Sequence, residues 1–290
     1  KVNNKGLEFN LTSRNISGEL SWSTDFNYSK NKNEVIALGG ENEPIYSKGS
    51  AGVRHITRVG DAVGSYYGWV VEGIYQSQSE IDSAPTDKMA KAPRPGDFRF
   101  KDVNGDGIID SDDRTITGSY NPDYIWGITN RFKYKNFDLS IFFQGVEGRE
   151  ILNLTARHMK NGEANFNSYD VLNNRWISES QPGDGKTPRA DRSTGTHGNN
   201  NRPSSYQVED GSYARLKNLT IGYTLPKSMS EKYADNIRLY FTAKNLATWT
   251  DYIGFNPEVS LQSQNMLTQG EDYGAYPLSV SLVFGFNVTF

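Results

Sequence analysis

Apolar and polar residues alternate along several stretches of the chain, and the last stretch shows the pattern most clearly. From Leu278 to Phe290 every even position is apolar, and the odd positions are mostly small or polar. The side chains of a strand point alternately to its two faces, so one face of this segment is a continuous apolar stripe. The stripe is longer than the ~9–11 residues that a tilted transmembrane strand needs. It also fits a half-buried strand of a soluble β-sandwich, and this segment alone leaves both interpretations open.

The same period of two recurs earlier in the chain, which leads us to predict seven strands in all. The six earlier segments are residues 7–11, 20–28, 124–134, 137–143, 219–225 and 237–243.

The predicted connections alternate between short and long. The short ones are residues 14–17, a turn at Lys135 and residues 226–236, and the long ones are residues 31–123, 148–211 and 249–274. Soluble domains rarely contain unstructured loops beyond ~12–15 residues. Outer-membrane barrels combine tight periplasmic turns with long external loops. The pattern therefore favours an all-β, antiparallel transmembrane β-barrel with long extracellular loops, and with Phe290 at the periplasmic end every long loop lies outside.

The composition narrows the class of protein further. The chain has 290 residues and a net charge of −3, which does not suggest a nucleic-acid partner. No run approaches the ~18 apolar residues of a membrane helix. Aromatic residues make up 12% of the chain, as expected for strands and for the aromatic girdles of a barrel, and the absence of cysteine excludes disulfides. Seven strands cannot close a bacterial barrel, which has an even number of at least 8, so we expect residues 1–290 to be a fragment of a larger barrel.

Residues 102–113 match the twelve-residue calcium loop. Oxygen ligands fall at the required positions, and Gly107 occupies position 6, where the loop turns sharply. The predicted Ca²⁺ ligands are Asp102, Asn104, Asp106, the carbonyl of Ile108, Asp110 directly or through water, and Asp113. Asp113 replaces the usual glutamate. Because no helical pattern flanks the loop, we expect a structural calcium site in an external loop, with an Asx-rich turn that binds no metal as the alternative.

The sequence contains no pattern of catalytic residues, and we predict that the protein is not an enzyme. The three histidines, His55, His158 and His197, lie far apart and are interpreted as solvated loop residues. The aromatic residues of the predicted external segments are interpreted more readily as loop anchors than as ligand contacts; they are Trp69, Trp176, Trp249 and Tyr252.

Several of these motifs together resemble the SusC/RagA-like TonB-dependent outer-membrane transporters. The most specific is residues 95–110, followed by Asp113-Arg114-Thr115. Other similar stretches are residues 4–8, 32–35, 59–60, 67–68, 73–75, 134–139, 215–223 and 243–246, together with the closing aromatic strand. Tyr120 departs from the pattern, because the family often has a proline there.

The resemblance implies that this chain is the C-terminal part of a 22-stranded barrel, the plugged transporter class. It implies an N-terminal plug and first strands that are absent here, a SusD-like surface lipoprotein as lid, and energy from TonB acting through the absent N-terminal region. The transporter would import glycan or peptide oligomers across the outer membrane of a Gram-negative cell, with lipid around the barrel. Two alternatives remain at this stage: a secreted carbohydrate-active protein with a dockerin-like calcium loop, and a soluble β-sandwich adhesin.

Overall fold

The computed structural model describes residues 1–290 except 90–91, 161, 163–166, 191–199 and 261–263. Its dominant feature is one antiparallel sheet in which each strand pairs with the next long strand along the chain. In sheet order the strands are β1 (Val2–Ile16), β2 (Leu20–Val35), β11 (Tyr124–Tyr134), β12 (Phe137–Glu147), β15 (Tyr213–Thr224), β16 (Asn236–Thr250) and β18 (Ser281–Thr289). The seven predicted strands are confirmed, although several are longer than the alternation indicated. The first turn was placed too early, because β1 continues to Ile16.

The remaining elements are short and lie mainly in the long connections. The first connection contains β3 (Ile45–Gly49), β4 (Gly52–Thr57), β5 (Ser65–Gly68), β6 (Val71–Ile74), α1 (Gln78–Asp82), β7 (Thr86–Asp87), β8 (Phe98–Phe100), β9 (Ile108–Ile109), η1 (Ser111–Asp113) and β10 (Thr115–Gly118). The later long connections contain β13 (Glu150–Asn153), α2 (Ala156–Met159), η2 (Asp170–Asn174), η3 (Ser205–Gln207), β14 (Val208–Asp210) and β17 (Glu271–Asp272), and α3 (Lys227–Ser230) lies in the short connection between β15 and β16.

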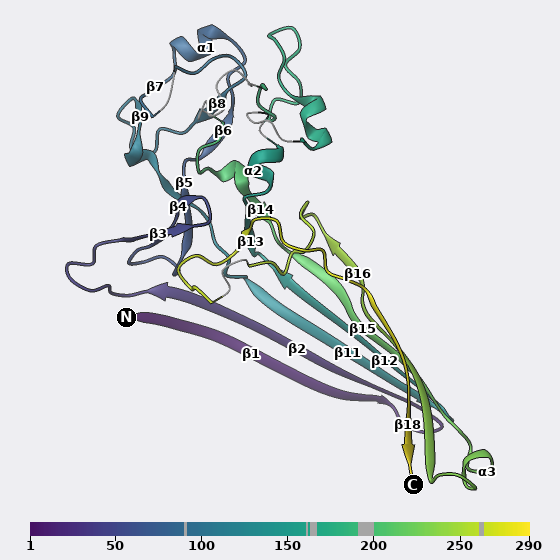
Figure 1. Ribbon diagram of the computed structural model, residues 1–290. Helices are drawn as coiled ribbons and strands as arrows, with labels where there is room; N and C mark the ends of the chain where they lie inside the picture. Colours follow the sequence, from purple (N-terminus) through teal and green to yellow (C-terminus); the bar gives the residue numbers. More distant parts are fainter. Residues whose placement is uncertain (90–91, 161, 163–166, 191–199, 261–263) are drawn as a thin grey trace.

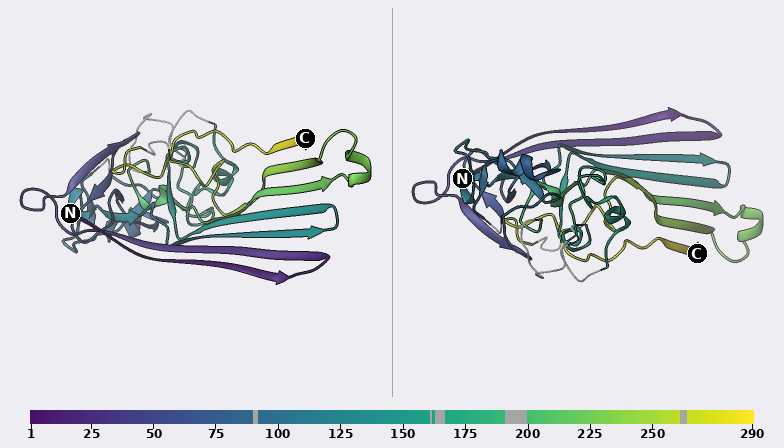
Figure 2. Two further views of the ribbon diagram at one scale, coloured as in Figure 1. Left: turned by 90° about the horizontal axis from the view of Figure 1, so that it is seen from below. Right: turned by 90° about the horizontal axis from the view of Figure 1, so that it is seen from above.

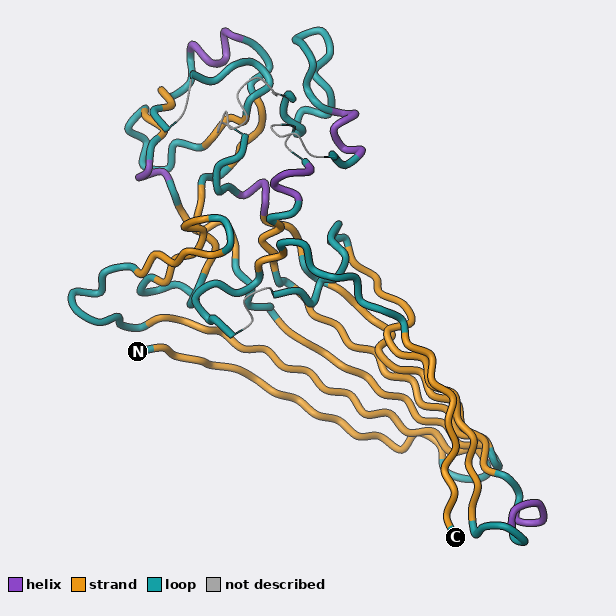
Figure 3. Tube along the Cα trace, viewed as in Figure 1, coloured by secondary structure: helices purple, strands orange, loops and turns teal. Residues whose placement is uncertain are grey.

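The two ends of the sheet differ, as the connection lengths predicted. Figure 1 shows the C terminus and α3 at one end, and the long connections gathered at the other. Figure 2 gives the same arrangement from two further sides. The tube in Figure 3 shows that much of the material at this end is loop rather than strand. Among the described residues, no helix is long and apolar enough to cross a membrane.

The strand register brings the predicted apolar stripes onto one side of the sheet, which we call the apolar face. It carries Leu7, Phe9, Leu11, Trp22, Phe26, Ile128, Phe132, Leu139, Ile141, Leu219, Ile221, Leu239, Phe241, Phe284 and Phe286. Cross-strand pairs such as Phe241 and Phe284, whose ring centroids lie 4.8 Å apart, reinforce the pairing. The face is open to its surroundings: Phe284 is 80% exposed and Phe286 is 71% exposed. In the described part of the chain no second sheet covers this face, as one would in a β-sandwich.

Four polar residues interrupt the apolar face near the end with short turns, and they bond to one another. Asn130 accepts hydrogen bonds from Trp22 Nε1 at 2.9 Å and from Thr24 Oγ1 at 2.7 Å. Asn15 donates to Thr24 Oγ1 and accepts from Ser13, each at 2.8 Å. Because these groups satisfy one another, they can lie on an apolar surface at reduced cost.

The opposite side, which we call the polar face, carries ion pairs between strands, one between the neighbours β2 and β11 and one between β12 and β16 across β15. Arg238 Nε donates to Asp138 Oδ1 at 2.9 Å, and Arg131 pairs with Asp25, which also accepts a bond from Thr12 at 2.8 Å.

The hydrophobic core lies among the long connections rather than against the sheet. In the described part of the chain it consists of three clusters of buried side chains, which contain Trp69, Tyr66 and Tyr252 respectively. The first long connection therefore has structure of its own. The core holds the connections over one end of the sheet, where the candidate sites lie.

Candidate metal loop and polar-face site

The predicted calcium loop has the backbone turns that its glycines suggest. Gly105 and Gly107 adopt φ values of +76° and +81°, the left-handed region that side chains with a Cβ rarely enter. After the second glycine, β9 pairs in parallel with β7, where Thr86 lies opposite Ile108. The sharp turn expected at position 6 is thus present, and the chain leaves it as an extended segment.

In the first half of the loop, side-chain oxygens accept hydrogen bonds from backbone N–H groups a few residues ahead. Asp102 accepts from Gly105 at 2.6 Å and from Gly107 at 2.8 Å. Asn104 accepts from Asp106 at 3.0 Å, and Asp106 accepts from Ile108 at 2.9 Å. These bonds, which include Asx turns at Asn104 and Asp106, shape the first half of the loop.

The second half of the loop forms a capping box. Asp110 caps the short helix η1, and its side chain accepts from Asp112 N at 2.9 Å. Asp113 is fully buried, and its two carboxylate oxygens accept from the N–H groups of Val103 and Asp110 at 2.7 and 2.8 Å. Asp113 therefore bridges the two ends of the loop, a role for which its short side chain is suited.

The structure brings all six predicted ligands into one loop. Their oxygens are directed mainly at backbone N–H groups. Among the described residues, no group of three or more acidic, histidine or cysteine side chains is arranged to hold a metal ion. The residues are chemically suitable, because Ca²⁺ prefers hard oxygen ligands and the set includes an amide and a main-chain carbonyl. Calcium binding stays a prediction.

A second candidate site lies on the polar face, near the end that carries the long connections. A β-bulge helps to build it. In β15, Asn218 pairs with Phe142 and Leu216 pairs with Phe143, so Lys217 is the extra residue between them. In β16 the register skips Asn245 and Leu246, and Asn245 has a φ of +54°. An inserted residue changes the side to which the following side chains point. The bulge thereby places Arg215 on the polar face, where continued alternation from Leu219 would have put it on the apolar face.

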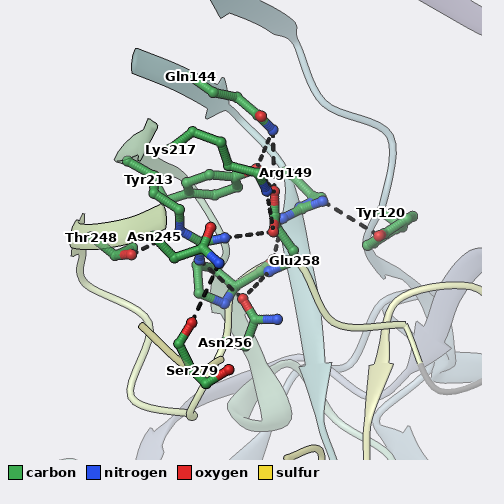
Figure 4. Close-up of polar contacts among 12 residues, drawn as sticks. Tyr120, Gln144, Arg149, Tyr213, Lys217, Asn245, Thr248, Asn256, Glu258 and Ser279 are labelled. Carbon is green, nitrogen blue, oxygen red and sulfur yellow. Dashed lines mark hydrogen bonds and ion pairs between the residues drawn. The ribbon is translucent and has the colours of Figure 1, made fainter. Parts of the chain in front are cut away.

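Glu258, from the last long connection, is the centre of this site (Figure 4). Its Oε1 accepts from Tyr213 Oη at 2.8 Å and from Gln144 Nε2 at 3.1 Å. Arg215 Nη1 lies 2.5 Å from Oε2, and Lys217 Nζ lies 3.2 Å from both oxygens. Burial alone would raise the pKa of Glu258, but the Tyr213 hydrogen bond and the charges of Arg215 and Lys217 lower it below the usual value. Glu258 is therefore held as a carboxylate.

Arg149 lies beside this group and is 7% exposed. Its guanidinium carbon is 5.0 Å from the ring centroid of Tyr120 and 5.6 Å from that of Tyr213. Arg149 Nη1 donates to Tyr120 Oη at 3.3 Å, and Nη2 donates to the carbonyl of Pro257. Glu258 and Arg149 come from connections in which the sequence pattern had singled out no ligand, so this site was not predicted. The only signal in the sequence was that the alternation of apolar and polar residues changes phase between Leu216 and Leu219.

The interpretation of His55 as a solvated loop residue is wrong. His55 is fully buried, and its Nε2 lies 2.9 Å from Glu271 Oε1 while its Nδ1 lies 3.1 Å from the carbonyl oxygen of Gly64. Glu271 also accepts from Ser50 N at 2.9 Å and Ser50 Oγ at 2.7 Å. This pair joins the first long connection to the last. His158 is half-buried, which corrects its interpretation as well, and His197 lies outside the described residues.

The aromatic residues of the connections behave mainly as anchors. Trp69 and Tyr252 are each 5% exposed, and Trp176 packs against the cluster around Trp69. Trp249 differs, with 55% of its surface exposed at the end of β16.

Comparison with known proteins extends over the whole chain. No family model matches it. Two curated proteins of Formosa agariphila, the TonB-dependent receptors P3 and P26, are 36% and 34% identical to it over all of its length. The TonB-dependent receptor SusC of Bacteroides thetaiotaomicron is 25% identical, again over the whole chain. The chain spans 29% of the length of the two Formosa receptors and 26% of that of SusC.

Solved structures of similar fold agree. A structure of the RagAB peptide transporter matches the whole of this chain with a TM-score of 0.76 and 21% identity. The match covers 29% of the transporter chain. The RagAB peptide importer in its 'open-open' state matches with a TM-score of 0.75 and 20% identity, again over 29% of that chain. At this identity the likeness concerns the fold. The relatives are named as receptors, transporters or importers rather than enzymes, as the sequence predicted.

Proposed function

The chain belongs to the SusC/RagA-like TonB-dependent receptors, and on this premise we propose that it forms part of the wall of an outer-membrane nutrient importer. The whole-length similarity to TonB-dependent receptors carries the proposal. The two faces of the sheet support it. The apolar face has the composition of a surface in contact with lipid, and the polar face carries the charged pairs of a barrel interior.

We also propose that further strands and a plug complete the barrel. Among the described residues, no strand pairs with the outer edges of β1 and β18, and the relatives are more than three times as long as this chain. We propose that residues 1–290 form the C-terminal part of a 22-stranded, plugged barrel, with the plug and first strands in a preceding segment. Edge strands with unpaired backbone groups are unfavourable in a membrane, which is the physical reason for expecting neighbouring strands.

The partners and the substrate are proposed on the same basis. The partners are a SusD-like surface lipoprotein above the long connections and TonB at the opposite side of the membrane. The cargo is a glycan or peptide oligomer that enters the barrel from the end where the connections lie. No bond in the cargo changes. The protein provides a surface that recognises the oligomer and a wall that excludes lipid from its path.

The test is uptake by cells that carry the intact receptor. A labelled oligomer should accumulate in the periplasm only when the receptor is present and TonB is functional. A receptor that fractionates with the outer membrane and gives identical uptake with and without TonB would refute the proposal. Recovery of the receptor in the soluble fraction would refute the membrane assignment.

We also propose that the loop of residues 102–113 binds one structural Ca²⁺. The spacing of its oxygen ligands and the left-handed Gly107 support this. Metal would neutralise the carboxylates held in one loop and stabilise the folded connection by mass action, by ~2.7 kcal/mol when free calcium is 100 times the Kd.

The calcium proposal has a matched pair of variants. Asp106→Ala removes a predicted ligand, whereas Asp112→Ala removes an exposed carboxylate of the same loop that is not one. In the intact receptor, calcium should slow proteolysis of the long connections in the wild type and in Asp112→Ala, but not in Asp106→Ala. Equal cleavage of the wild type with calcium and with chelator would mean that the loop is only an Asx-rich turn.

A further inference from the structure

The polar face contains a hollow of ≈ 420 Å³ next to the cluster around Glu258. Paired residues line it in a row: Asn27 pairs with Gly127 and Gly127 with Gln144, and Gln144 pairs with Arg215 beside the hollow. Gly127 lets the side chains of Asn27 and Phe142 approach the middle of the row, because a Cβ there would lie 2.9 Å from the first and 3.2 Å from the second. The hollow has both apolar walls and convergent polar groups, the usual composition of a ligand site.

The charges around the hollow do not balance. Arg149, Arg215 and Lys217 supply positive charges, and Glu258 is the carboxylate among them. Glu258 is already shared by Arg215 and Lys217, each within 3.2 Å of a carboxylate oxygen. Among the residues that the structure describes, the group therefore has a surplus of cationic side chains, and Arg149 is the member that contacts no carboxylate.

Arg149 is satisfied only in part. Its side chain contacts a phenol, a main-chain carbonyl and two aromatic rings, while its buried Nε has no hydrogen-bond partner in the described part of the chain. A buried guanidinium without a counter-ion is unfavourable, because the charge loses its hydration and none of these neighbours carries the opposite charge. Guanidinium groups bind carboxylates strongly and in a defined plane.

We propose that this hollow is a subsite for the C-terminal end of a peptide cargo, with Arg149 binding the terminal carboxylate. The apolar walls, which include Ile125 and Phe142, would receive the last side chain of the peptide. The amide of Asn27 offers a donor and an acceptor to its main chain, and Gln144, whose Nε2 already donates to Tyr213 and Glu258, offers its Oε1 as an acceptor. This inference rests on the proposed importer function and adds to it a substrate class, a residue and a requirement for negative charge.

The experiment measures binding of matched peptides to the purified, intact receptor in detergent. The probes are two tetrapeptides of the same sequence ending in leucine, one with a free C-terminal carboxylate and one with a C-terminal amide. Isothermal titration should give a Kd at least tenfold lower for the free carboxylate in the wild type. Arg149→Gln should remove this preference, and Arg149→Lys should restore part of it because the charge is kept.

Arg131→Gln is the matched control. It removes another arginine of the polar face, one that is already paired with Asp25, and it should leave the preference unchanged. Thermal melting of each variant establishes whether it is folded. If Arg149→Gln does not fold, Arg149→Lys still tests the inference.

Three results would overturn the inference. The first is equal affinity of the wild type for the carboxylate and amide peptides, and the second is a preference for the carboxylate that persists in Arg149→Gln. The third is binding of a trigalacturonate through Arg149 when neither peptide binds, which would assign the subsite to acidic glycans. Because TonB-dependent uptake is measured separately, loss of the peptide preference with uptake intact would reject the subsite and leave the importer function standing.

Discussion

Arginine at Phe284 provides the sharpest test of which face of the sheet meets lipid. Phe284 belongs to the apolar face and is 80% exposed, so its replacement removes few contacts within this chain. The adjacent Val283 belongs to the polar face, where it pairs with Thr242. Arginine at these two neighbouring positions therefore differs mainly in whether the charge is placed in hydrocarbon or in the barrel interior.

The strand geometry gives the expected magnitude. Phe284 lies six residues before Phe290, or about 20 Å along a strand that rises ~3.3 Å per residue. With a tilt of about 40°, this becomes ~15 Å along the membrane normal, close to the middle of an apolar band ~25 Å tall if Phe290 lies at its boundary. Arginine at the midplane costs ~2–4 kcal/mol. The folding equilibrium should thus shift by roughly 30-fold to 1000-fold, since ~1.4 kcal/mol is tenfold.

The assay is urea titration of the intact receptor folded into lipid vesicles, followed by tryptophan fluorescence. Phe284→Ala corrects for loss of the ring itself. Val283→Arg should cost less than about 1 kcal/mol, and Leu282→Arg, ~20 Å from the boundary at Phe290 by the same geometry, should fall between the two. Equal destabilisation by arginine at positions 283 and 284, after the alanine correction, would show that the two faces have been assigned wrongly.

Two further predictions concern the long connections. Burial alone would raise the pKa of Glu271, but hydrogen bonds from His55 and Ser50 lower it below the usual 4.5. Ionised Glu271 therefore stabilises the fold above pH 4.5, and this stabilisation is lost as the pH falls through the lowered pKa. Proteolysis of the connections should accelerate in that pH range, and Glu271→Gln should weaken this pH dependence. An unchanged pH dependence in Glu271→Gln would contradict the prediction. Gly270 has a φ of +80°, and a Cβ there would lie 1.9 Å from Tyr66 Oη. Gly270→Ala should cost at least ~1–2 kcal/mol from backbone strain alone, with faster cleavage of the same connections as the readout, whereas Gly274→Ala, at the same φ with open space around it, should cost less.

Much of the sheet could be predicted because alternation is a local property. Whether Leu239, Phe241 and Ala243 share a face depends only on the extended backbone between them, and the register confirms that they do. The strand count and the placement of the long connections at one end follow from the same pattern. The turn at Gly107 was predictable for a similar reason, since a glycine at a fixed spacing from its neighbours specifies a local backbone conformation.

The candidate binding site depended on contacts between distant parts of the chain. His55 and Glu271 are separated by 216 positions, and nothing near either residue in the sequence indicates that the other will cover it. Arg215 reaches the polar face only because the bulge at Lys217 shifts the alternation, and Glu258 reaches it from a different connection. The sequence by itself determined the strands, their faces and the pattern of the calcium loop, because these follow from neighbouring residues. Tertiary structure alone decided which charges meet, because burial and pairing are settled when segments far apart in the chain pack over the same end of the sheet.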